Sequence, residues 1–304
     1  MKPKILVTGG SGLLAINWAV MLRDSYSVIL AIHDRKISLA GVDSIVMNLD
    51  SVDALVRAFD TLKPDIVVHT ASLTSVEQCE SSPILAQFVN VELAANVAAA
   101  CAFFGLPLVH ISTDHLFQGV ESFLDETSAI SPINGYGRTK AAAELRVLDI
   151  CPGAMVIRTN FWGWGTSYRH SFSDVIINAL RSGKVLTLFH DVYYTPILIE
   201  ELVLVVHQLV GMHESGVFNV VGDERISKYE FGRKLAREFN LDKALINRGS
   251  FSDQADLVQR PHDMSLSNQK VCKLLGRTLG DVNSHISRLH LQEKMGLAQK
   301  LQEL

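Results

Sequence analysis

Residues 112–144 bring an alcohol, a phenol and an amine close together along the chain. Tyr136 and Lys140 are four residues apart, so they share one face if this segment is a helix. An ammonium near a phenol favours phenolate and lowers the phenol pKa, which would let Tyr136 move a proton near neutral pH. Thr113 follows an apolar run and could hydrogen-bond the same substrate oxygen. These residue types predict polarisation of a carbonyl group while a nicotinamide delivers hydride to its carbon.

A glycine-rich turn, VTGGSGLLA, lies near the N-terminus between an apolar run and a helical pattern. Gly9 and Gly12 permit a tight turn, and the helix that follows offers free N–H groups to a pyrophosphate. This placement is typical of dinucleotide-binding α/β proteins. The cofactor contacts predicted from the turn, a later strand end and the Tyr–Lys helix are Gly9, Ser11, Gly12, Leu13, Leu14, Ala71 and Lys140.

The segment AIHDRKI, after the second apolar run, bears on which dinucleotide binds. An acid at this place would bind the ribose hydroxyls of NAD, whereas basic residues would favour the extra phosphate of NADP. His33 and Arg35 therefore favour NADPH, with NADH as the alternative, although a solvated loop also explains the basic residues. Asp50 follows the next strand-like run and could meet the adenine or serve only as a helix N-cap.

The elements that must position these groups alternate along the first half of the chain. Strand-like runs occupy 4–8, 26–32, 65–71, 106–112 and 154–159. Helical patterns occupy 13–23, a segment capped by Asp50 or Ser51, a long segment opening near Pro83, and about 136–149. Strands that are apolar on both faces and alternate with helices predict a parallel sheet covered on both sides. Right-handed crossovers then give an α/β, Rossmann-type doubly wound fold.

The second half loses this rhythm. The aromatic and glycine-rich segment FWGWGTSYRHSF predicts a loop. Helices are predicted at about 171–182 and 198–211, and the capping-box signature SKYE predicts the start of another helix. We expect 1–160 to form the dinucleotide-binding domain, with segments near 185–200 and 216–222 returning to its sheet. Most of 161–304 is expected to form a smaller C-terminal substrate-binding domain.

Composition excludes several classes of partner. A net charge of -4 argues against nucleic acid. The longest apolar run carries Glu200 and Glu201 at its centre, which predicts an amphipathic helix and no membrane span. The N-terminus lacks the features of an export signal, and the four scattered cysteines fit neither a disulfide framework nor a zinc site. We expect a cytoplasmic protein without a metal, in which His69 and His110 are satisfied core histidines.

Several motifs, in order, resemble the extended short-chain dehydrogenase/reductases and, among them, the dTDP-4-dehydrorhamnose reductase family. They include VTGGSGLLA, HISTDHLFQG, SPINGYGRTKAAAE, VIRTNFWGWG and RPHDMSLSNQKVCKLLG, and they span nearly the whole chain. The resemblance implies that Thr113, Tyr136 and Lys140 are catalytic, with Tyr136 as proton donor and Lys140 on the nicotinamide ribose. It also implies NAD(P)H-dependent reduction of a nucleotide-activated 4-keto-6-deoxy sugar in deoxysugar biosynthesis, and it makes a homodimer plausible.

The same resemblance suggests how a nucleotide sugar would be held. Asn160 lies with Arg158 and Gly163 in a segment similar to a phosphate-contacting pattern, one residue shorter than its common form. Arg260 suits paired phosphate oxygens, although an ion pair with Asp256 or Asp263 would also explain it. The predicted substrate-binding residues are Thr113, Asp114, His115, Tyr136, Asn160, Trp162 and Arg260. Trp164, Tyr168, Tyr193 and Tyr194 could stack on a base or sugar or pack in the core. Glu77 and Glu80 could line the site or support a dimer.

One departure from the family pattern keeps the substrate open. The family usually carries Tyr after Ser-Thr-Asp, where this chain has His115, which could contact the sugar, relay a proton or simply pack. Related dehydratases place Glu there, so His115 favours keto reduction over dehydration. Two alternatives to the reductase stay open: a non-catalytic NADP-binding subunit similar to the regulatory β subunit of methionine adenosyltransferase, and a nucleotide-sugar epimerase or dehydratase that retains NAD.

Overall fold

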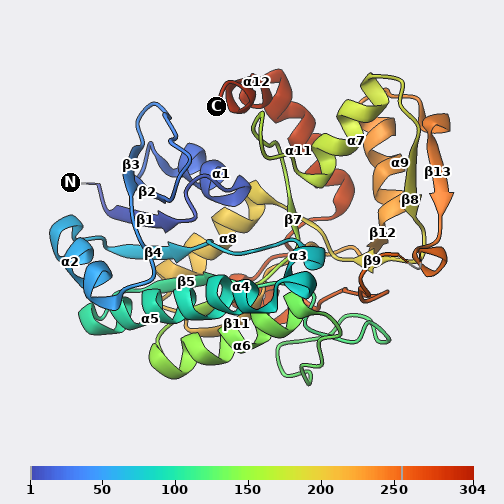
Figure 1. Cartoon of the computed structure of the whole chain (residues 1–304). Helices are drawn as coiled ribbons and strands as arrows, with labels where there is room; N and C mark the ends of the chain where they lie inside the picture. Colours follow the sequence, from blue (N-terminus) through green and yellow to red (C-terminus); the bar gives the residue numbers. More distant parts are fainter. Residues whose placement is uncertain (1, 255) are drawn as a thin grey trace.

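The computed structural model describes residues 2–254 and 256–304. Within them, seven parallel strands form a central sheet in the order β11-β6-β5-β4-β1-β2-β3 (Figure 1). The strands are β1 (Lys4–Thr8), β2 (Ser27–Ile32), β3 (Asp43–Val46), β4 (Ile66–His69), β5 (Leu108–Ile111), β6 (Met155–Arg158) and β11 (Gly216–Asn219). The strand order reverses between β1 and β4, and ligands bind at this switch point in doubly wound folds. The predicted Rossmann-type fold is confirmed.

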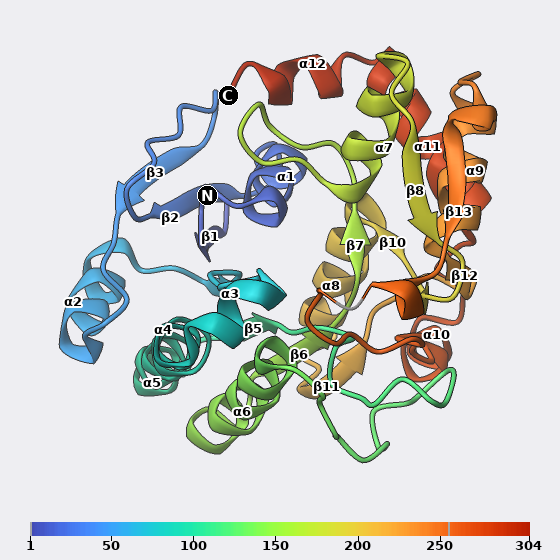
Figure 2. The same cartoon turned by 45° about the vertical axis from the view of Figure 1, so that its right-hand side comes forward.

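Helices cover both faces of the sheet. Ile5 and Val7 of β1 pack in a core with α1 (Leu13–Leu22) and α8 (Ile199–Gly211). Leu6 faces the opposite core, which holds α2 (Val52–Leu62), α5 (Leu93–Phe104) and α6 (Gly135–Ile150). Figures 1 and 2 show α4 (Pro83–Gln87), α5 and α6 together in one layer. Because both faces are buried, these strands are continuous apolar runs in the sequence.

The helix predicted near Pro83 runs from α4 into α5, with a π-helical turn (Phe88–Glu92) between them. Asn90 lies in this turn, and its Nδ2 donates to Thr139 Oγ1 of α6 over 2.9 Å. Among the described residues, Pro83–Phe104 is the one helical stretch long and apolar enough to cross a membrane by length and composition. Half of the most apolar part of this stretch is buried inside the protein, as in the core helix of a folded domain. The expected absence of membrane contact stays a prediction.

The C-terminal half contributes shorter strands and several helices. They are β7 (Phe161–Trp162), α7 (Phe172–Arg181), β8 (Leu186–Phe189), β9 (Tyr193–Tyr194), β10 (Ile197–Leu198), β12 (Ile226–Ser227), α9 (Lys228–Glu238), β13 (Ile246–Gly249), α10 (Gln269–Leu275), α11 (Val282–Lys294) and α12 (Leu297–Gln302). β11 joins the central sheet beside β6, as expected for 216–222. The expected return of segments near 185–200 is wrong, because β8, β9 and β10 pair with β13, β12 and β7 in separate two-stranded sheets. Only Leu188 of β8 is fully buried, whereas a central parallel strand is covered on both faces.

The two halves meet along the loop that follows β5. Gly119 O accepts a hydrogen bond from Asp263 N over 3.2 Å, and Asn134 Nδ2 donates to Gln259 O over 2.9 Å. Figure 2 shows this orange segment next to the green loop that precedes α6. One hydrophobic core also runs from β1 to Phe231 of α9. The domain boundary at 160 therefore stays a prediction.

Candidate active site

The glycine turn connects β1 to α1 at the switch point of the sheet. Gly9 has φ +69°, and a Cβ atom there would lie 2.7 Å from Ala71 N, just beyond β4. Gly12 is the N-cap of α1, and because it has no side chain, none competes for the first N–H groups of the helix at Leu13 and Leu14. This cradle would be filled by any larger side chain, and it fits a pyrophosphate bound through backbone N–H groups.

Tyr168 links the glycine turn to the end of β2. Its hydroxyl donates to Ser11 O over 3.1 Å, and the Arg35 guanidinium lies 3.9 Å from the centroid of its ring. His33 Nδ1 lies 2.8 Å from Asp34 Oδ2, and both side chains are exposed. Tyr168, which the sequence suggested for a base or sugar, therefore lies at the cofactor end of the site.

Asp50 lies in the exposed segment after β3. The N-cap of α2 is Ser51, whose Oγ accepts a hydrogen bond from Ala54 N over 3.3 Å. The interpretation of Asp50 as the cap is therefore wrong, and its contact with the adenine stays a prediction.

The start of α6, which carries the Tyr–Lys pair, is fixed by two polar side chains. Asn134 is the N-cap and accepts from Gly137 N over 2.8 Å. The Glu80 carboxylate accepts from Gly135 N and pairs with Arg138 Nη2 at 2.9 Å. Glu80 belongs to the short helix α3 (Val76–Ser81), so its predicted place near the site has a physical reason: it anchors the N-terminus of α6.

The helix and the loop after β5 approach each other closely at Gly137. A Cβ atom there would lie 2.2 Å from His115 O. The approach places the His115 ring edge-on to the Tyr136 ring, with 5.5 Å between centroids. Thr113 Oγ1 donates to Asp114 Oδ1 over 3.3 Å and accepts from His115 N over 3.2 Å, and the Thr113 side chain is near enough to Tyr136 to act on its pKa, so Thr113, His115 and Tyr136 lie together at the carboxyl edge of the sheet.

The electrostatics of Tyr136 differ from the expectation. Burial raises the pKa of Tyr136 to about 12, and the hydrogen bond with Thr113 opposes the shift only in part. Lys140 Nζ donates to Ile111 O over 2.7 Å, and the Tyr136 pKa is raised, whereas the sequence predicted that Lys140 would lower it. Burial lowers the pKa of Lys140 to about 8, against the opposing charge of Glu144. At neutral pH the phenol keeps its proton, as a proton donor must.

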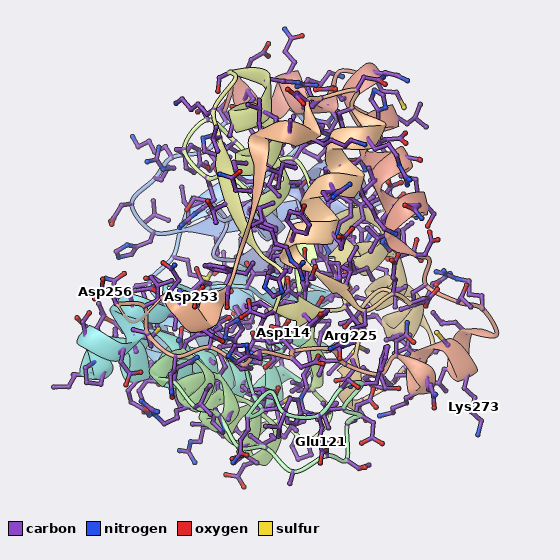
Figure 3. All side chains as sticks on the ribbon, turned by 90° about the vertical axis from the view of Figure 1, so that its right-hand side faces the viewer. Asp114, Glu121, Arg225, Asp253, Asp256 and Lys273 are labelled. Carbon is purple, nitrogen blue, oxygen red and sulfur yellow. The ribbon has the colours of Figure 1, made fainter. Side chains whose placement is uncertain are left out.

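Asp114 forms the polar centre of the site, where the sheet half meets the C-terminal half (Figure 3). It is 2% exposed, and its Oδ2 accepts from Asn160 Nδ2 over 2.6 Å. Burial raises the pKa of Asp114 to about 6, and the bond from Asn160 opposes that shift. His115 Nε2 lies 4.0 Å from Asp114 Oδ1, and burial lowers the pKa of His115 to about 3, so its ring is neutral.

Arg260 reaches back across the site. Its Nη2 pairs with Glu77 at the start of α3, and its Nη1 donates to Val258 O over 3.1 Å. The alternative ion pairs of Arg260 with Asp256 or Asp263 are therefore wrong, and Asp263 pairs instead with Arg225.

Two other predicted ligand contacts lie in the core. Trp162 is 1% exposed, and its ring packs edge-on against Phe231, so it offers no open stacking surface. Arg158 is buried and forks onto both oxygens of Glu144, with Nη2 to Oε2 at 2.8 Å. This buried pair ties α6 to β6, so the phosphate-contacting pattern at Arg158 serves packing instead.

His69 and His110 are buried neighbours in β4 and β5, with stacked rings 5.4 Å apart. His69 Nδ1 bonds Thr8 Oγ1 at 2.8 Å, whereas His69 Nε2 and both nitrogens of His110 have no partner among the described residues. The expectation of satisfied core histidines therefore holds for one nitrogen of four. Burial lowers the pKa of both rings, so they stay neutral.

Lys228 is a site residue that the sequence did not single out. Its Nζ lies 3.4 Å from the centroid of the buried Tyr194 ring, and burial lowers its pKa to about 8. The Asp114 carboxylate opposes this shift, so the two charges act on each other, although no ion pair within 4.0 Å joins them. The capping box SKYE predicted the helix start but gave no signal for this contact, because the two residues are far apart in sequence.

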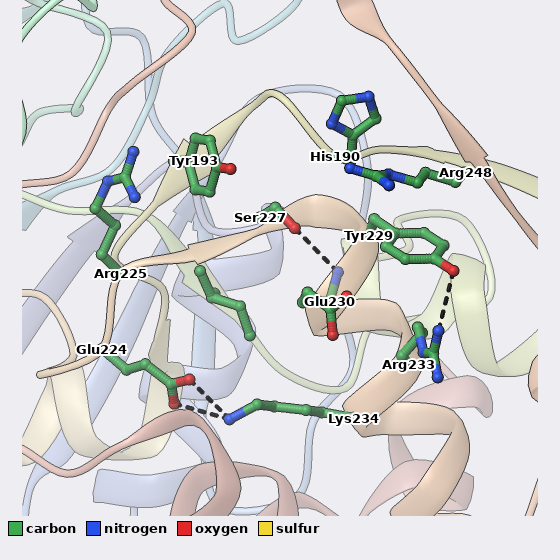
Figure 4. Close-up of a pocket in the computed structure, with 11 residues that line it drawn as sticks. His190, Tyr193, Glu224, Arg225, Ser227, Tyr229, Glu230, Arg233, Lys234 and Arg248 are labelled. Carbon is green, nitrogen blue, oxygen red and sulfur yellow. Dashed lines mark hydrogen bonds and ion pairs between the residues drawn. The ribbon is translucent and has the colours of Figure 1, made fainter.

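A pocket of about 590 Å³ lies outside the β9–β12 pair, along the start of α9 (Figure 4). Arg225 lies 3.8 Å from the Tyr193 ring centroid, and Arg233 donates to Tyr229 Oη over 3.1 Å. Cations outnumber acids along its wall, which suits an anionic ligand. The lining residues are His190, Tyr193, Glu224, Arg225, Ile226, Ser227, Tyr229, Glu230, Arg233, Lys234 and Arg248. Over the described residues, no group of three or more His, Cys, Asp or Glu side chains could hold a metal ion.

A doubly wound sheet with a glycine cradle at its switch point and a Thr–Tyr–Lys site at its carboxyl edge defines the class of extended short-chain dehydrogenase/reductases. The sequence model of the family described as "RmlD substrate binding domain" matches residues 2–293, and the chain belongs to this family.

Comparison with individual proteins agrees with the family. The chain is 29% identical over 277 residues to the "Probable low-salt glycan biosynthesis reductase Agl14" of Haloferax volcanii, covering 89% of this chain and 91% of the relative. It is 28% identical over 231 residues to "Methionine adenosyltransferase 2 subunit beta" of Xenopus laevis, covering 74% of this chain and 68% of the relative. The crystal structure of dTDP-4-dehydrorhamnose reductase from Bacillus anthracis in complex with NADP superposes with a TM-score of 0.85 at 24% identity, covering 96% and 100%. At that identity the likeness shows the shared fold.

Proposed function

We propose that the protein is an NAD(P)H-dependent reductase of a nucleotide-activated 4-keto-6-deoxy sugar. The observation that carries the proposal is the meeting of Thr113, Tyr136 and Lys140 with the glycine cradle at one edge of the sheet. Relatives with whole-length similarity carry reductase names, and one neighbouring structure is that of a dTDP-4-dehydrorhamnose reductase with NADP.

The chain's own residues can perform the proton half of this reduction. Tyr136 donates its phenolic proton to the carbonyl oxygen, which becomes the new hydroxyl. Thr113 donates a second hydrogen bond to the same oxygen and stabilises the developing negative charge. When bound, the reduced nicotinamide supplies the hydride. Because the Tyr136 phenol is desolvated, it is present as the acid before each turnover.

We propose NADPH as the cofactor, with NADH as the alternative. The backbone at Gly9, Gly12 and Leu13 would hold the pyrophosphate, and Arg35 would meet the additional phosphate after leaving Tyr168. Lys140 would bind the nicotinamide ribose through its ammonium. The exposed Asp34 beside His33 is the residue that would favour NADH instead.

The nucleotide end of the substrate is proposed to extend from Arg260 toward the pocket beside Tyr193. Arg260 can exchange Glu77 for the diphosphate, since a guanidinium fork suits paired phosphate oxygens. The pocket offers the Tyr193 and Tyr229 rings and several cations for the rest of the nucleotide. Asp263, three residues after Arg260, pairs with Arg225 and bridges Tyr193, so the segment 260–263 runs from Arg260 to the pocket and supports this path.

The test is consumption of NADPH by the purified protein with dTDP-4-dehydrorhamnose, with product analysis by NMR. Steady turnover that needs both compounds is the expected result. A non-catalytic subunit similar to the methionine adenosyltransferase β subunit would bind NADPH without turnover. A retained-NAD epimerase or dehydratase would carry NAD through purification and consume no NADPH.

A further inference from the structure

Lys228 occupies an unusual place for a lysine. It is the first residue of α9, and its backbone N donates to Val192 O over 3.1 Å, beside the β9–β12 pair. Its neighbours Ser227 and Tyr229 line the outer pocket, whereas the Lys228 side chain points to the opposite side, over the buried Tyr194 ring. A second ring, that of Phe172, lies 4.8 Å from Nζ.

The groups around this ammonium belong to the candidate active site. The charge of Lys228 acts on Asp114 and on His115, and His115 stacks edge-on against Tyr136. The Lys228 ammonium lies over the face of the Tyr194 ring; burial raises the pKa of the Tyr194 phenol, and the Asp114 carboxylate adds to this rise. Lys228 lies on the Tyr194 ring and both residues feel the charge of Asp114, whose Oδ1 lies 4.0 Å from Nε2 of His115, the residue that packs against Tyr136; we call Lys228, Tyr194 and Asp114 the sugar wall.

Polar atoms on this wall lack partners among the described residues. Tyr194 Oη and His115 Nδ1 are buried and make no hydrogen bond. Buried polar groups are nearly always satisfied in folded proteins, so these two atoms are free to bond a ligand. Lys228 and Asp114 carry one charge of each sign, so the two residues together have no net charge to attract an anion. The wall suits a neutral ligand rich in hydroxyl groups.

We propose that Lys228 and Asp114, with the hydroxyl of Tyr194, hold neighbouring hydroxyl groups of the sugar ring and so position its carbonyl at Tyr136. Asp114 accepts from one sugar hydroxyl and Lys228 donates to the next. This positioning role rests on the proposed function for the identity of the sugar nucleotide. It selects neutral sugars with adjacent hydroxyls over sugars that lack one of them.

The test compares two ligands that the protein cannot turn over, dTDP-glucose and dTDP, by calorimetry with the NADPH-loaded protein. Wild type should bind dTDP-glucose more tightly than dTDP. Lys228→Met should lose about tenfold or more of the affinity for dTDP-glucose, as expected for a hydrogen bond to a charged group, with the affinity for dTDP unchanged. Tyr194→Phe, which removes one oxygen and keeps the ring, should lose a smaller part of the same increment. Lys273→Met, an exposed lysine of α10, is the matched control and should bind as wild type does.

The outcomes separate the two proposals. If wild type fails to reduce dTDP-4-dehydrorhamnose, the proposed function is wrong, whereas the binding comparison still reports on the sugar wall. Equal binding of dTDP-glucose and dTDP by wild type overturns the wall. Should Lys228→Met fail to fold, Tyr194→Phe decides: wild-type affinity of that variant for dTDP-glucose overturns the proposal. With dTDP-4-dehydrorhamnose, a folded Lys228→Met is expected to show a raised KM and an unshifted pH profile, since it holds the sugar and moves no proton.

Discussion

A desolvated phenol keeps its proton, and Tyr136 is such a phenol because burial raises its pKa to about 12. Phenylalanine keeps the ring packing against His115 and removes only the hydroxyl with its proton. Tyr136→Phe should therefore lower kcat by about 100-fold or more, the range of general acid catalysis. NADPH affinity, measured by fluorescence titration, should stay within a few-fold of wild type. A variant with wild-type kcat would remove Tyr136 from the chemistry.

If Lys140 binds the cofactor as proposed, its ammonium should set the alkaline limit of activity. Burial lowers its pKa to about 8, so its ammonium is present below that pH and is lost as the pH rises through it. If the ammonium binds the nicotinamide ribose, kcat/KM for NADPH should fall as the pH rises through about 8. Tyr136→Phe is the control, because its residual activity should keep this limb, whereas a limb caused by the phenol would vanish. A flat profile up to the pH of unfolding would contradict the role of Lys140.

At the scale of elements, α6 and the loop after β5 pack closely against each other and together position Tyr136. Gly137 allows their approach, since a Cβ atom there would lie 2.2 Å from His115 O. Alanine normally stabilises a helix relative to glycine, so a loss at this position would have to come from the clash. Gly137→Ala should lower the free energy of unfolding by about 1–3 kcal/mol, as overpacking does, and should lower kcat by displacing Tyr136.

The matched control for Gly137→Ala is Gly153→Ala, where an added Cβ meets nothing within 4 Å. It should leave both kcat and the thermal unfolding temperature near those of wild type. Equal stability of the two alanine variants would mean that α6 can shift to relieve the contact.

The elements also show why some features were predictable from the sequence. The central strands are apolar on both faces, and the spacing of Tyr136 and Lys140 is a local property of one helix. β8 was misplaced because a short strand with one buried face reads like a core strand. The fork of Arg158 onto Glu144 and the approach of Lys228 to Asp114 depend on tertiary packing between distant segments, and nothing in the local pattern encodes them. The same holds for the hydrogen bond from Lys140 to Ile111 O.

At the scale of the whole molecule, Arg260 connects the C-terminal half to Glu77 of the sheet half. If the substrate diphosphate takes this guanidinium, Arg260→Ala should raise KM for a nucleotide sugar by about 10-fold or more and leave KM for NADPH unchanged. Glu77→Gln removes the competing carboxylate and should lower KM or leave it unchanged. Steady-state kinetics with both variants checks this pair. An unchanged KM in Arg260→Ala would remove Arg260 from the site.

The dependence of the site on segments from both ends of the chain has a consequence for synthesis on the ribosome. β11 closes the edge of the sheet only after residue 219 has emerged, and Asp263 reaches Gly119 later still. Until then a nascent chain carries Asp114 without Lys228 beside it. Contacts between such distant segments form slowly, and the unfinished half presents uncovered apolar surface to chaperones and proteases. A stalled chain ending before α9 would already contain the glycine turn and Tyr136, yet it would lack Lys228 and Arg260.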